Sequence, residues 1–176
     1  LHRMNVLHLH LTDDQGWRME IRKYPRLTEI GSWRSHSVID NEYVRAPGAE
    51  PVRDLAPHSG YLTQDDLREI VAYAGERFIT VVPEVDLPGH SQAVIASYPR
   101  LGNTTEQLDV WTDWGVSPHV LNVEDATIDF CRDVLDEVMD VFPGEFVHIG
   151  GDEVPKDEWR ASASAQERIA ALGLAD

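Results

Sequence analysis

The 176-residue sequence has one cysteine, Cys131, and about half as many basic as acidic side chains. One cysteine excludes an internal disulfide framework and any cysteine-rich metal site. The 15 Lys and Arg residues against 31 Asp and Glu residues give a formal net charge of −16. This charge argues against binding to nucleic acids or anionic membrane surfaces, because both need a basic patch. No apolar run approaches the roughly 20 residues of a membrane-spanning helix.

Three short apolar segments alternate with three helical patterns along the chain. The predicted strands are 4–11, 78–82 and 146–149, and the predicted helices are 63–75, 124–142 and 164–172. Thr63 with Asp66, and Ser164 with Glu167, have the spacing of capping boxes at helix starts. Strands that alternate with helices indicate an α/β fold with a parallel sheet and crossover helices.

The extra length of the chain lies at one edge of the predicted sheet. The links from strand to helix are long, about 14–62 and 84–123, whereas the links from helix to strand are a few residues. The long links therefore follow the carboxyl ends of the strands, where parallel α/β folds bind ligands. The sequence opens at Leu1 without an initiator Met and inside a strand-like pattern. We expect residues 1–176 to be a single piece of a larger protein. The sequence does not indicate the cellular compartment of that protein.

Titratable residues follow every predicted strand. They are Asp13 and Asp14 after the first strand, Glu84, Asp86 and His90 after the second, and His148, Asp152 and Glu153 in and after the third. Gly150 and Gly151 permit a sharp bend, which could aim Asp152 and Glu153 at one point. Two carboxyl groups that share a site push their pKa values apart, so that one is ionised while the other holds a proton. The sequence therefore predicts an active site at this edge of the sheet.

Glycoside cleavage is one chemistry that fits these residues. It needs an acid that protonates the leaving oxygen and a group that stabilises an oxocarbenium-like carbon. The neighbours Asp152 and Glu153 supply both types of group. An acid beside an ionised carboxylate needs a network that holds its proton, and Asp13 and His90 are suitable members of such a network.

Metal-dependent hydrolysis is the alternative chemistry, and it depends on His8 and His10. These residues share one face of the first predicted strand, as do the paired metal ligands of barrel metallohydrolases. Asp13 has the opposite parity along a regular strand, and no Cys or Lys pattern completes a ligand set. A core or supporting role for both histidines is favoured. We therefore expect no metal and no cofactor.

Three blocks of the sequence resemble the signature blocks of glycoside hydrolase family 20, the β-N-acetylhexosaminidases. The blocks are HLTDDQGWR at 10–18, PEVDLPGH at 83–90 and HIGGDEV at 148–154. They stand in the order and spacing of that family, and the similarity runs through essentially all of the chain. Three coincident blocks make a specific resemblance, whereas a lone GGDE would be weak.

The resemblance implies roles for five residues. Glu153 is implied to be the general acid, which later acts as the base that activates water. Asp152 is implied to orient the substrate's 2-acetamido group and to stabilise the positive charge that develops on its nitrogen. Asp13 and His90 are implied to be a buried pair that supports Glu153, with His148 as a support beneath the site. The resemblance gives Trp17 and Glu84 no catalytic step.

The resemblance also implies a fold and a substrate. The fold is a (β/α)8 TIM barrel, with residues 1–176 as roughly its second to fourth βα units. Since three units cannot close an eight-stranded barrel, the isolated piece is expected to be inactive. The implied reaction is retaining, substrate-assisted hydrolysis, through an oxazolinium ion, of terminal β-linked N-acetylglucosamine or N-acetylgalactosamine on glycans or chitooligosaccharides. The family's sugar-gripping arginine and pocket tryptophans fall outside the three blocks, so a catalytically silent sugar-binding relative stays an alternative.

Overall fold

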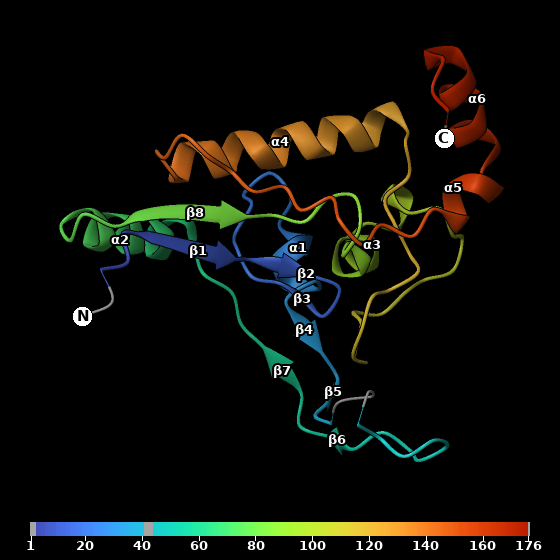
Figure 1. The fold of residues 1–176 in the computed structure, drawn as a ribbon, viewed down its shortest axis with the longest axis horizontal. Helices are drawn as coiled ribbons and strands as arrows, with labels where there is room; N and C mark the ends of the chain where they lie inside the picture. The colour runs from blue at the N-terminus through green and yellow to red at the C-terminus, as the bar shows by residue number, and fades with distance from the viewer. Residues whose placement is uncertain (1–2, 41–43, 176) are drawn as a thin grey trace.

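The computed structural model describes residues 3–40 and 44–175, and the central element is a parallel strand pair (Figure 1). Strand β1 (Val6–His10) pairs with β8 (Thr80–Glu84), in a register that sets Val6 opposite Thr80 and His10 opposite Glu84. The parallel pairing agrees with the predicted class of sheet. Residues 41–43, part of the predicted loop at 14–62, lie outside the described residues.

The predicted third strand at 146–149 is reduced to a single parallel bridge between Glu84 and His148. His148 donates its N–H to the carbonyl of Pro83 at 2.9 Å and accepts from the N–H of Val85 at 2.9 Å. The next bond of a parallel ladder would run from the nitrogen of residue 83 to the carbonyl of residue 146. Proline has no N–H, so this bond cannot form and the ladder stops.

The second strand begins later than predicted. Phe78 is 91% exposed and has a φ of 58°, so it belongs to the turn after the preceding helix, and the strand starts at Thr80. The prediction of a strand at 78–82 was therefore wrong by two residues at each end. Apolar character at Phe78 suggested burial, but the left-handed backbone at this position is incompatible with a strand.

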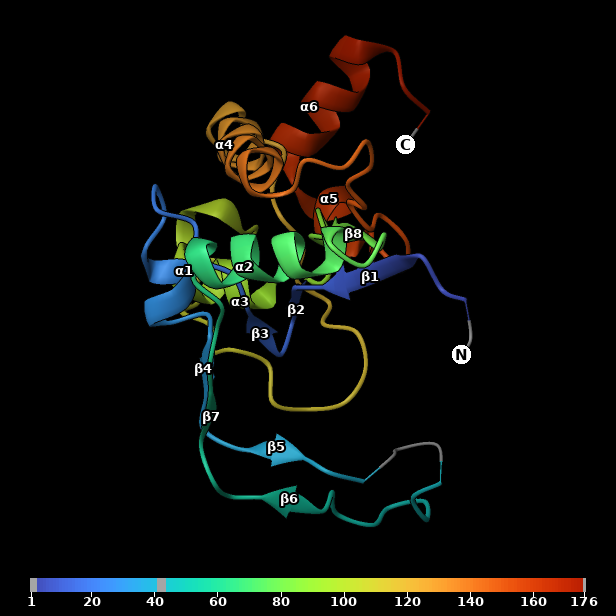
Figure 2. The ribbon, with the colours of Figure 1, turned by 90° about the vertical axis from the view of Figure 1, so that its left-hand side faces the viewer.

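Two long helices pack near the strand pair (Figures 1 and 2). Helix α2 (Gln64–Gly75) begins with the predicted capping box of Thr63 and Asp66. Helix α4 (Asp125–Val141) buries an apolar stripe that includes Phe130, Val134 and Val138, because these side chains recur on one face of the helix. Cys131 lies partly buried beside this core, and burial raises the pKa of its thiol to about 11. The thiol therefore stays protonated near neutral pH.

The last helix starts differently from the prediction. Helix α6 (Ala163–Leu172) is capped by the side chain of Ser162, which accepts from the N–H of Ala165, rather than by Ser164. A short helix, α5 (Asp157–Ala161), precedes it and was not predicted. The predicted stop at Gly173 is confirmed, since this residue has the left-handed backbone, φ 67°, that a helix C-terminus favours.

The two long connections contain further short elements beside the main strands and helices. The first contains β2 (Thr12–Asp13), β3 (Gly16–Trp17), α1 (Arg26–Glu29), β4 (Trp33–Arg34), β5 (Ser37–Val38), β6 (Arg53–Asp54) and β7 (His58–Ser59), and the second contains α3 (Gln92–Ser97) and η1 (Pro99–Leu101). Strands β4 to β7 form an arm that extends away from α2 and α4 (Figures 1 and 2). Within the described ranges, every helix is too short or too polar to cross a membrane.

Candidate active site

The carboxyl ends of the strands meet at one edge, as the sequence predicted for titratable residues. His10, the last residue of β1, lies opposite Glu84, the last residue of β8, and His148 bridges to Glu84 from the other side. The chain of β1 continues through Leu11 into the small hairpin of β2 and β3, which carries Asp13 over the edge. The edge therefore gathers side chains from segments up to about 140 residues apart in sequence.

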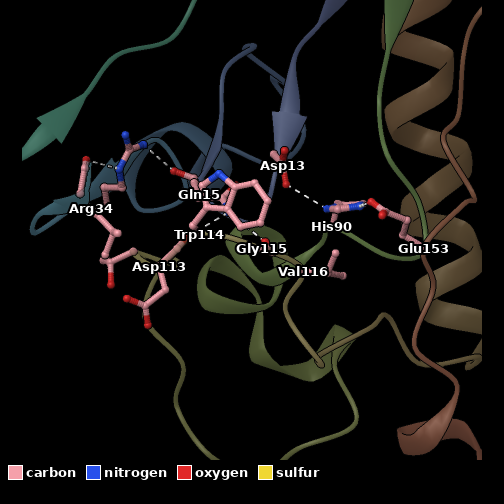
Figure 3. Close-up of a pocket in the computed structure, with 12 residues that line it drawn as sticks. Asp13, Gln15, Arg34, His90, Asp113, Trp114, Gly115, Val116 and Glu153 are labelled. Atoms are coloured by element: carbon pink, nitrogen blue, oxygen red, sulfur yellow. Dashed lines mark hydrogen bonds and ion pairs between the residues drawn. The ribbon is translucent and has the colours of Figure 1, made fainter. Parts of the chain in front are cut away.

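The imidazole of His90 lies between Asp13 and Glu153 (Figure 3). His90 Nδ1 is 3.0 Å from Asp13 Oδ1, and His90 Nε2 is 3.5 Å from Glu153 Oε2. The Glu153 side chain is 63% exposed, whereas that of His90 is 15% exposed. The structure thus brings three of the five predicted site residues, Asp13, His90 and Glu153, into one line of contacts that ends at the exposed carboxyl group of Glu153.

Two members of this line adopt a backbone conformation that is unusual for residues with a side chain. His90 has a φ of 47° and Glu153 a φ of 50°, both in the left-handed region. Such conformations cost of order 1–3 kcal/mol each and cluster at functional sites. The turns PGH and GGDE that precede or contain these residues allow the reversal of direction that points both side chains toward each other.

Asp14 contacts His90 from the buried side of this arrangement, a role that the sequence did not predict. Its carboxylate is fully buried, accepts the N–H groups of Gln92 and Ser117 at 3.0 Å each, and lies 3.3 Å from His90 Nδ1. Burial raises the pKa of Asp14, although these hydrogen bonds oppose the shift. The position of Asp14 in an acidic pair at a strand end was a signal for a site residue. Nothing in the sequence showed that Asp14 is buried whereas Asp13 is half-exposed.

The net electrostatic effect on His90 favours its protonated form. Burial lowers its pKa, but the charges of Asp13, Asp14 and Asp86 outweigh burial, so that the pKa of His90 is raised above its ordinary value. With its Nδ1 proton directed at Asp13, His90 can exchange a proton with Glu153 only through Nε2. This is the arrangement that a carboxyl group needs if it is to deliver and recover a proton.

A second cluster lies at the carboxyl ends of β1 and β8, around Glu84. His8 Nε2 contacts Glu84 Oε2, His10 Nδ1 is 3.2 Å from Glu84 Oε1, and His148 Nδ1 is 3.6 Å from the same oxygen. Burial opposes ionisation of Glu84, yet the neighbouring histidines outweigh it and lower its pKa. Burial and the charge of Glu84 raise the pKa of Asp86 to about 6. The predicted supporting residue His148 therefore belongs to this cluster.

The opposite parity of Asp13 along a regular strand, which counted against a metal site, does not separate Asp13 from His10. His10 Nε2 lies 3.2 Å from Asp13 Oδ2, because regular β1 ends at His10 and the strand alternation does not continue into β2. His8, Glu84 and His148 place possible metal-ligand atoms within 4.8 Å of one another, as do two neighbouring groups of His and acidic residues. The N–H of Gly150 donates to His148 Nδ1 at 3.1 Å, so the lone pair of this nitrogen is engaged in a hydrogen bond.

A cavity of about 450 Å³ opens beside Glu153 (Figure 3). Most of its lining residues belong to the two long connections, and Asp13 and Glu153 follow strand ends. The full lining is Asp13, Gln15, Arg34, Ser37, Val38, His90, Thr112, Asp113, Trp114, Gly115, Val116 and Glu153. Arg34 donates to the carbonyl of Gln15 at 2.8 Å, and the Gln15 amide donates to the carbonyls of Asp113 and Gly115 at 3.3 Å, which joins the walls. Asp152 is exposed and does not belong to this lining among the described residues.

Comparison with known proteins assigns the chain to a family. A family model described as "Glycosyl hydrolase family 20, catalytic domain" matches residues 1–176. The chain belongs to glycoside hydrolase family 20. A β-hexosaminidase from Porphyromonas gingivalis is 43% identical over 175 residues, which cover 99% of this chain and 20% of that protein.

Solved structures agree with the family assignment. The crystal structure of a β-N-acetylhexosaminidase has a TM-score of 0.87 at 36% identity, and the match covers 99% of this chain and 35% of that one. A family 20 exo-β-N-acetylglucosaminidase from Vibrio harveyi, solved in complex with N-acetylglucosamine, has a TM-score of 0.73 at 37% identity, over 98% of this chain and 26% of that one. Catalytic domains of this family are TIM barrels, and the chain matches their structure while spanning a fifth to about a third of these relatives.

Proposed function

We propose that the protein carrying these residues is a β-N-acetylhexosaminidase, which removes terminal β-linked N-acetylglucosamine or N-acetylgalactosamine from glycans or chitooligosaccharides. The observation that carries the proposal is the position of His90, between Asp13 at 3.0 Å and Glu153 at 3.5 Å. Family membership supports the reaction class, and the names of the relatives, which include an N,N'-diacetylchitobiase, support the substrate class.

Glu153 acts as the general acid in this proposal. It donates its proton to the glycosidic oxygen while the bond to the anomeric carbon breaks, and it later accepts a proton from the water that attacks the intermediate. The exposed fraction of Glu153 and its place in the wall of the cavity put its carboxyl group where a substrate oxygen can reach it. His90 and Asp13 control the protonation state of Glu153 during the proton transfer.

Asp152 acts on the substrate's acetamido group. The oxygen of this group attacks the anomeric carbon, which forms an oxazolinium ion with retained overall stereochemistry after hydrolysis, and Asp152 stabilises the positive charge on the nitrogen. A substrate that supplies its own nucleophile needs no second catalytic carboxylate across the sugar ring, in contrast to most retaining glycosidases. The adjacency of Asp152 and Glu153 after Gly151, which has a φ of 94°, suits this division of work.

We further propose that residues 1–176 form roughly the second to fourth βα units of the barrel, as a single structural piece with long βα connections. Three neighbouring barrel strands correspond to β1, β8 and the segment that contains the His148 bridge. The first two crossover helices correspond to α2 and α4. The connections follow the carboxyl ends of the strands, where barrel enzymes place their active sites.

A rate comparison in the full-length protein tests the proposed function. The substrates are an aryl 2-acetamido-2-deoxy-β-glucoside and the same glycoside with a plain 2-hydroxyl group. We expect cleavage of the first and almost none of the second, and we expect Glu153→Gln to lower kcat for the first by about 10²–10⁴-fold, as loss of a general acid does. Equal cleavage of both substrates would show that a protein nucleophile or a metal hydroxide does the work, and that Asp152 has another role.

A further inference from the structure

Asp13 is held from two opposite sides. Its Oδ1 atom faces His90 Nδ1 at 3.0 Å and accepts the N–H of Asp14 at 2.7 Å. Its Oδ2 atom faces His10 Nε2 at 3.2 Å. Both oxygens of this carboxylate therefore have fixed partners, and one of these partners, His10, lies outside the line from Asp13 to Glu153.

His10 links Asp13 to the cluster around Glu84. Its second ring nitrogen, Nδ1, lies 3.2 Å from Glu84 Oε1 and 3.9 Å from Asp86 Oδ2. A neutral imidazole has one N–H, so it can donate to only one of the two carboxylates, whereas an imidazolium donates to both. Burial lowers the pKa of His10, but hydrogen bonds with Asp13 and Glu84 outweigh burial and leave its pKa raised.

We propose that His10 is a positioning residue for catalysis, which holds Asp13 from the side opposite His90 as a cation anchored by Glu84. Through Asp13, His10 fixes the orientation of the His90 ring and reduces the negative charge that His90 experiences. The proposal rests on the proposed function only for its consequence at Glu153. The contacts of His10 themselves stand on the geometry of the described residues.

The charged surroundings of His10 determine the direction of its effect. The carboxylates that face it come from three segments: Asp13 of β2, Glu84 of β8 and Asp86 just after β8. On its other side, His10 lines a cavity of about 230 Å³ whose walls also include the charged or titratable residues Arg18, Arg34 and His58. Asp13 and Glu84 favour the protonated form of His10, and the cation of His10 in turn makes the environment of His90 less negative.

Removal of the charge on His10 has a defined consequence for His90. With glutamine at this position, one hydrogen bond to Asp13 is retained, but the positive charge is lost. The carboxylate of Asp13 is then less compensated, so His90 retains its proton to higher pH. A His90 cation stabilises the anion of Glu153, so the general acid loses its proton at lower pH.

Histidine NMR titration of the full-length protein tests the proposal without using activity. We expect His10 in the wild-type protein to titrate above the ordinary value for histidine, about 6.5, and we expect His10→Gln to raise the pKa of His90 by roughly half a unit or more. The matched control is His58→Gln, which removes an exposed histidine from the same cavity and should leave His90 unchanged. A wild-type His10 that titrates below 6.5, or an unchanged His90 in His10→Gln, overturns the proposal.

The pH profile of kcat/KM for the 2-acetamido substrate gives the catalytic readout. We expect its basic limb to move to lower pH by roughly half a unit in His10→Gln, with KM changed less than about twofold, and to stay in place in His58→Gln. A purely structural role would lower activity without moving the limb, and this result overturns the proposal. If the wild-type protein cleaves neither glycoside, the proposed function fails, whereas the NMR shifts still decide the role of His10.

Discussion

Gly150 lies against Asp86 so closely that a Cβ atom on the glycine would overlap the Asp86 Oδ1 atom. Gly150 also has a φ of 65°, a backbone conformation that favours glycine. The buried carboxyl group of Asp86 thus packs directly under the bend that turns the chain from the His148 bridge toward Glu153. The bend and the cluster of His and acidic side chains around Glu84 therefore pack directly against each other.

Substitution of Gly150 tests this packing. Gly150→Ala should abolish most activity and destabilise the protein, because the added Cβ must displace Asp86 or the bend itself. Gly151→Ala is the matched control: Gly151 also has a positive φ, but a Cβ there would lie 3.9 Å from the nearest atom outside its chain neighbours, the Leu87 carbonyl oxygen. Thermal unfolding should show that Gly150→Ala loses more folding free energy than Gly151→Ala, by at least about 1 kcal/mol. Equal losses would show that backbone strain alone explains the requirement for glycine.

The parts of the fold that the sequence revealed are those with strong local signals. The capping box of Thr63 and Asp66 fixes the start of α2, and the apolar stripe with Phe130 and Val134 defines α4. The approximate carboxyl ends of the strands were predictable because apolar runs give way to charged residues, although β8 extends two residues past its predicted end. Titratable groups such as Asp13 and His90 could therefore be assigned to one edge of the sheet before their contacts were known.

The parts that the sequence did not reveal depend on long-range contacts. The third strand was overestimated, since the missing N–H that stops its ladder belongs to Pro83 of another strand. The burial of Asp14 depends on the N–H groups of Gln92 and Ser117, which lie 78 and 103 residues away along the chain. His10 reaches Asp13 because β1 ends where it does, which strand alternation could not predict.

His90 should matter for the chemical step more than for substrate binding. His90→Gln removes the ring that lies between Asp13 and Glu153, so we expect kcat to fall by about 10²-fold or more, with KM within about threefold of the wild-type value. His58→Gln, the same change at an exposed position on β7, should leave both constants unchanged. Steady-state kinetics on the 2-acetamido glycoside measure the difference. A rise in KM at constant kcat would instead assign His90 to substrate binding.

Asp86 should make the stability of the protein depend on pH. Its folded pKa of about 6 lies above the ordinary value of 3.8, so the folded state prefers the protonated form. The stability from this group is fully present below about pH 4 and is lost as the pH rises through about 6, with a slope of at most about 1.4 kcal/mol per pH unit. Asp86→Asn cannot ionise, so this slope should disappear.

Unfolding experiments at about pH 4 and about pH 7 separate this effect from other titrations, because the wild-type protein serves as the reference at each pH. We expect the stability of Asp86→Asn relative to the wild type to increase between these two pH values. Asp65→Asn, a change at a carboxylate that is 85% exposed, should show no such increase. A difference between Asp86→Asn and wild type that is the same at both pH values would mean that Asp86 ionises normally.

Residues 1–176 expressed alone should be inactive and should expose apolar surface. Apolar side chains on the strand segments are exposed in this chain, with exposed fractions of 54% for Val6, 42% for Leu7, 68% for Phe146 and 52% for Ile149. In addition, the outer edge of β1 has no paired strand among the described residues. An unpaired edge beside apolar side chains favours association.

We expect strong binding of a hydrophobic dye, concentration-dependent association in light scattering, and no hydrolysis of the 2-acetamido glycoside. A monomer with a sharp cooperative thermal transition and weak dye binding would contradict this expectation and show that the three units form a self-sufficient core.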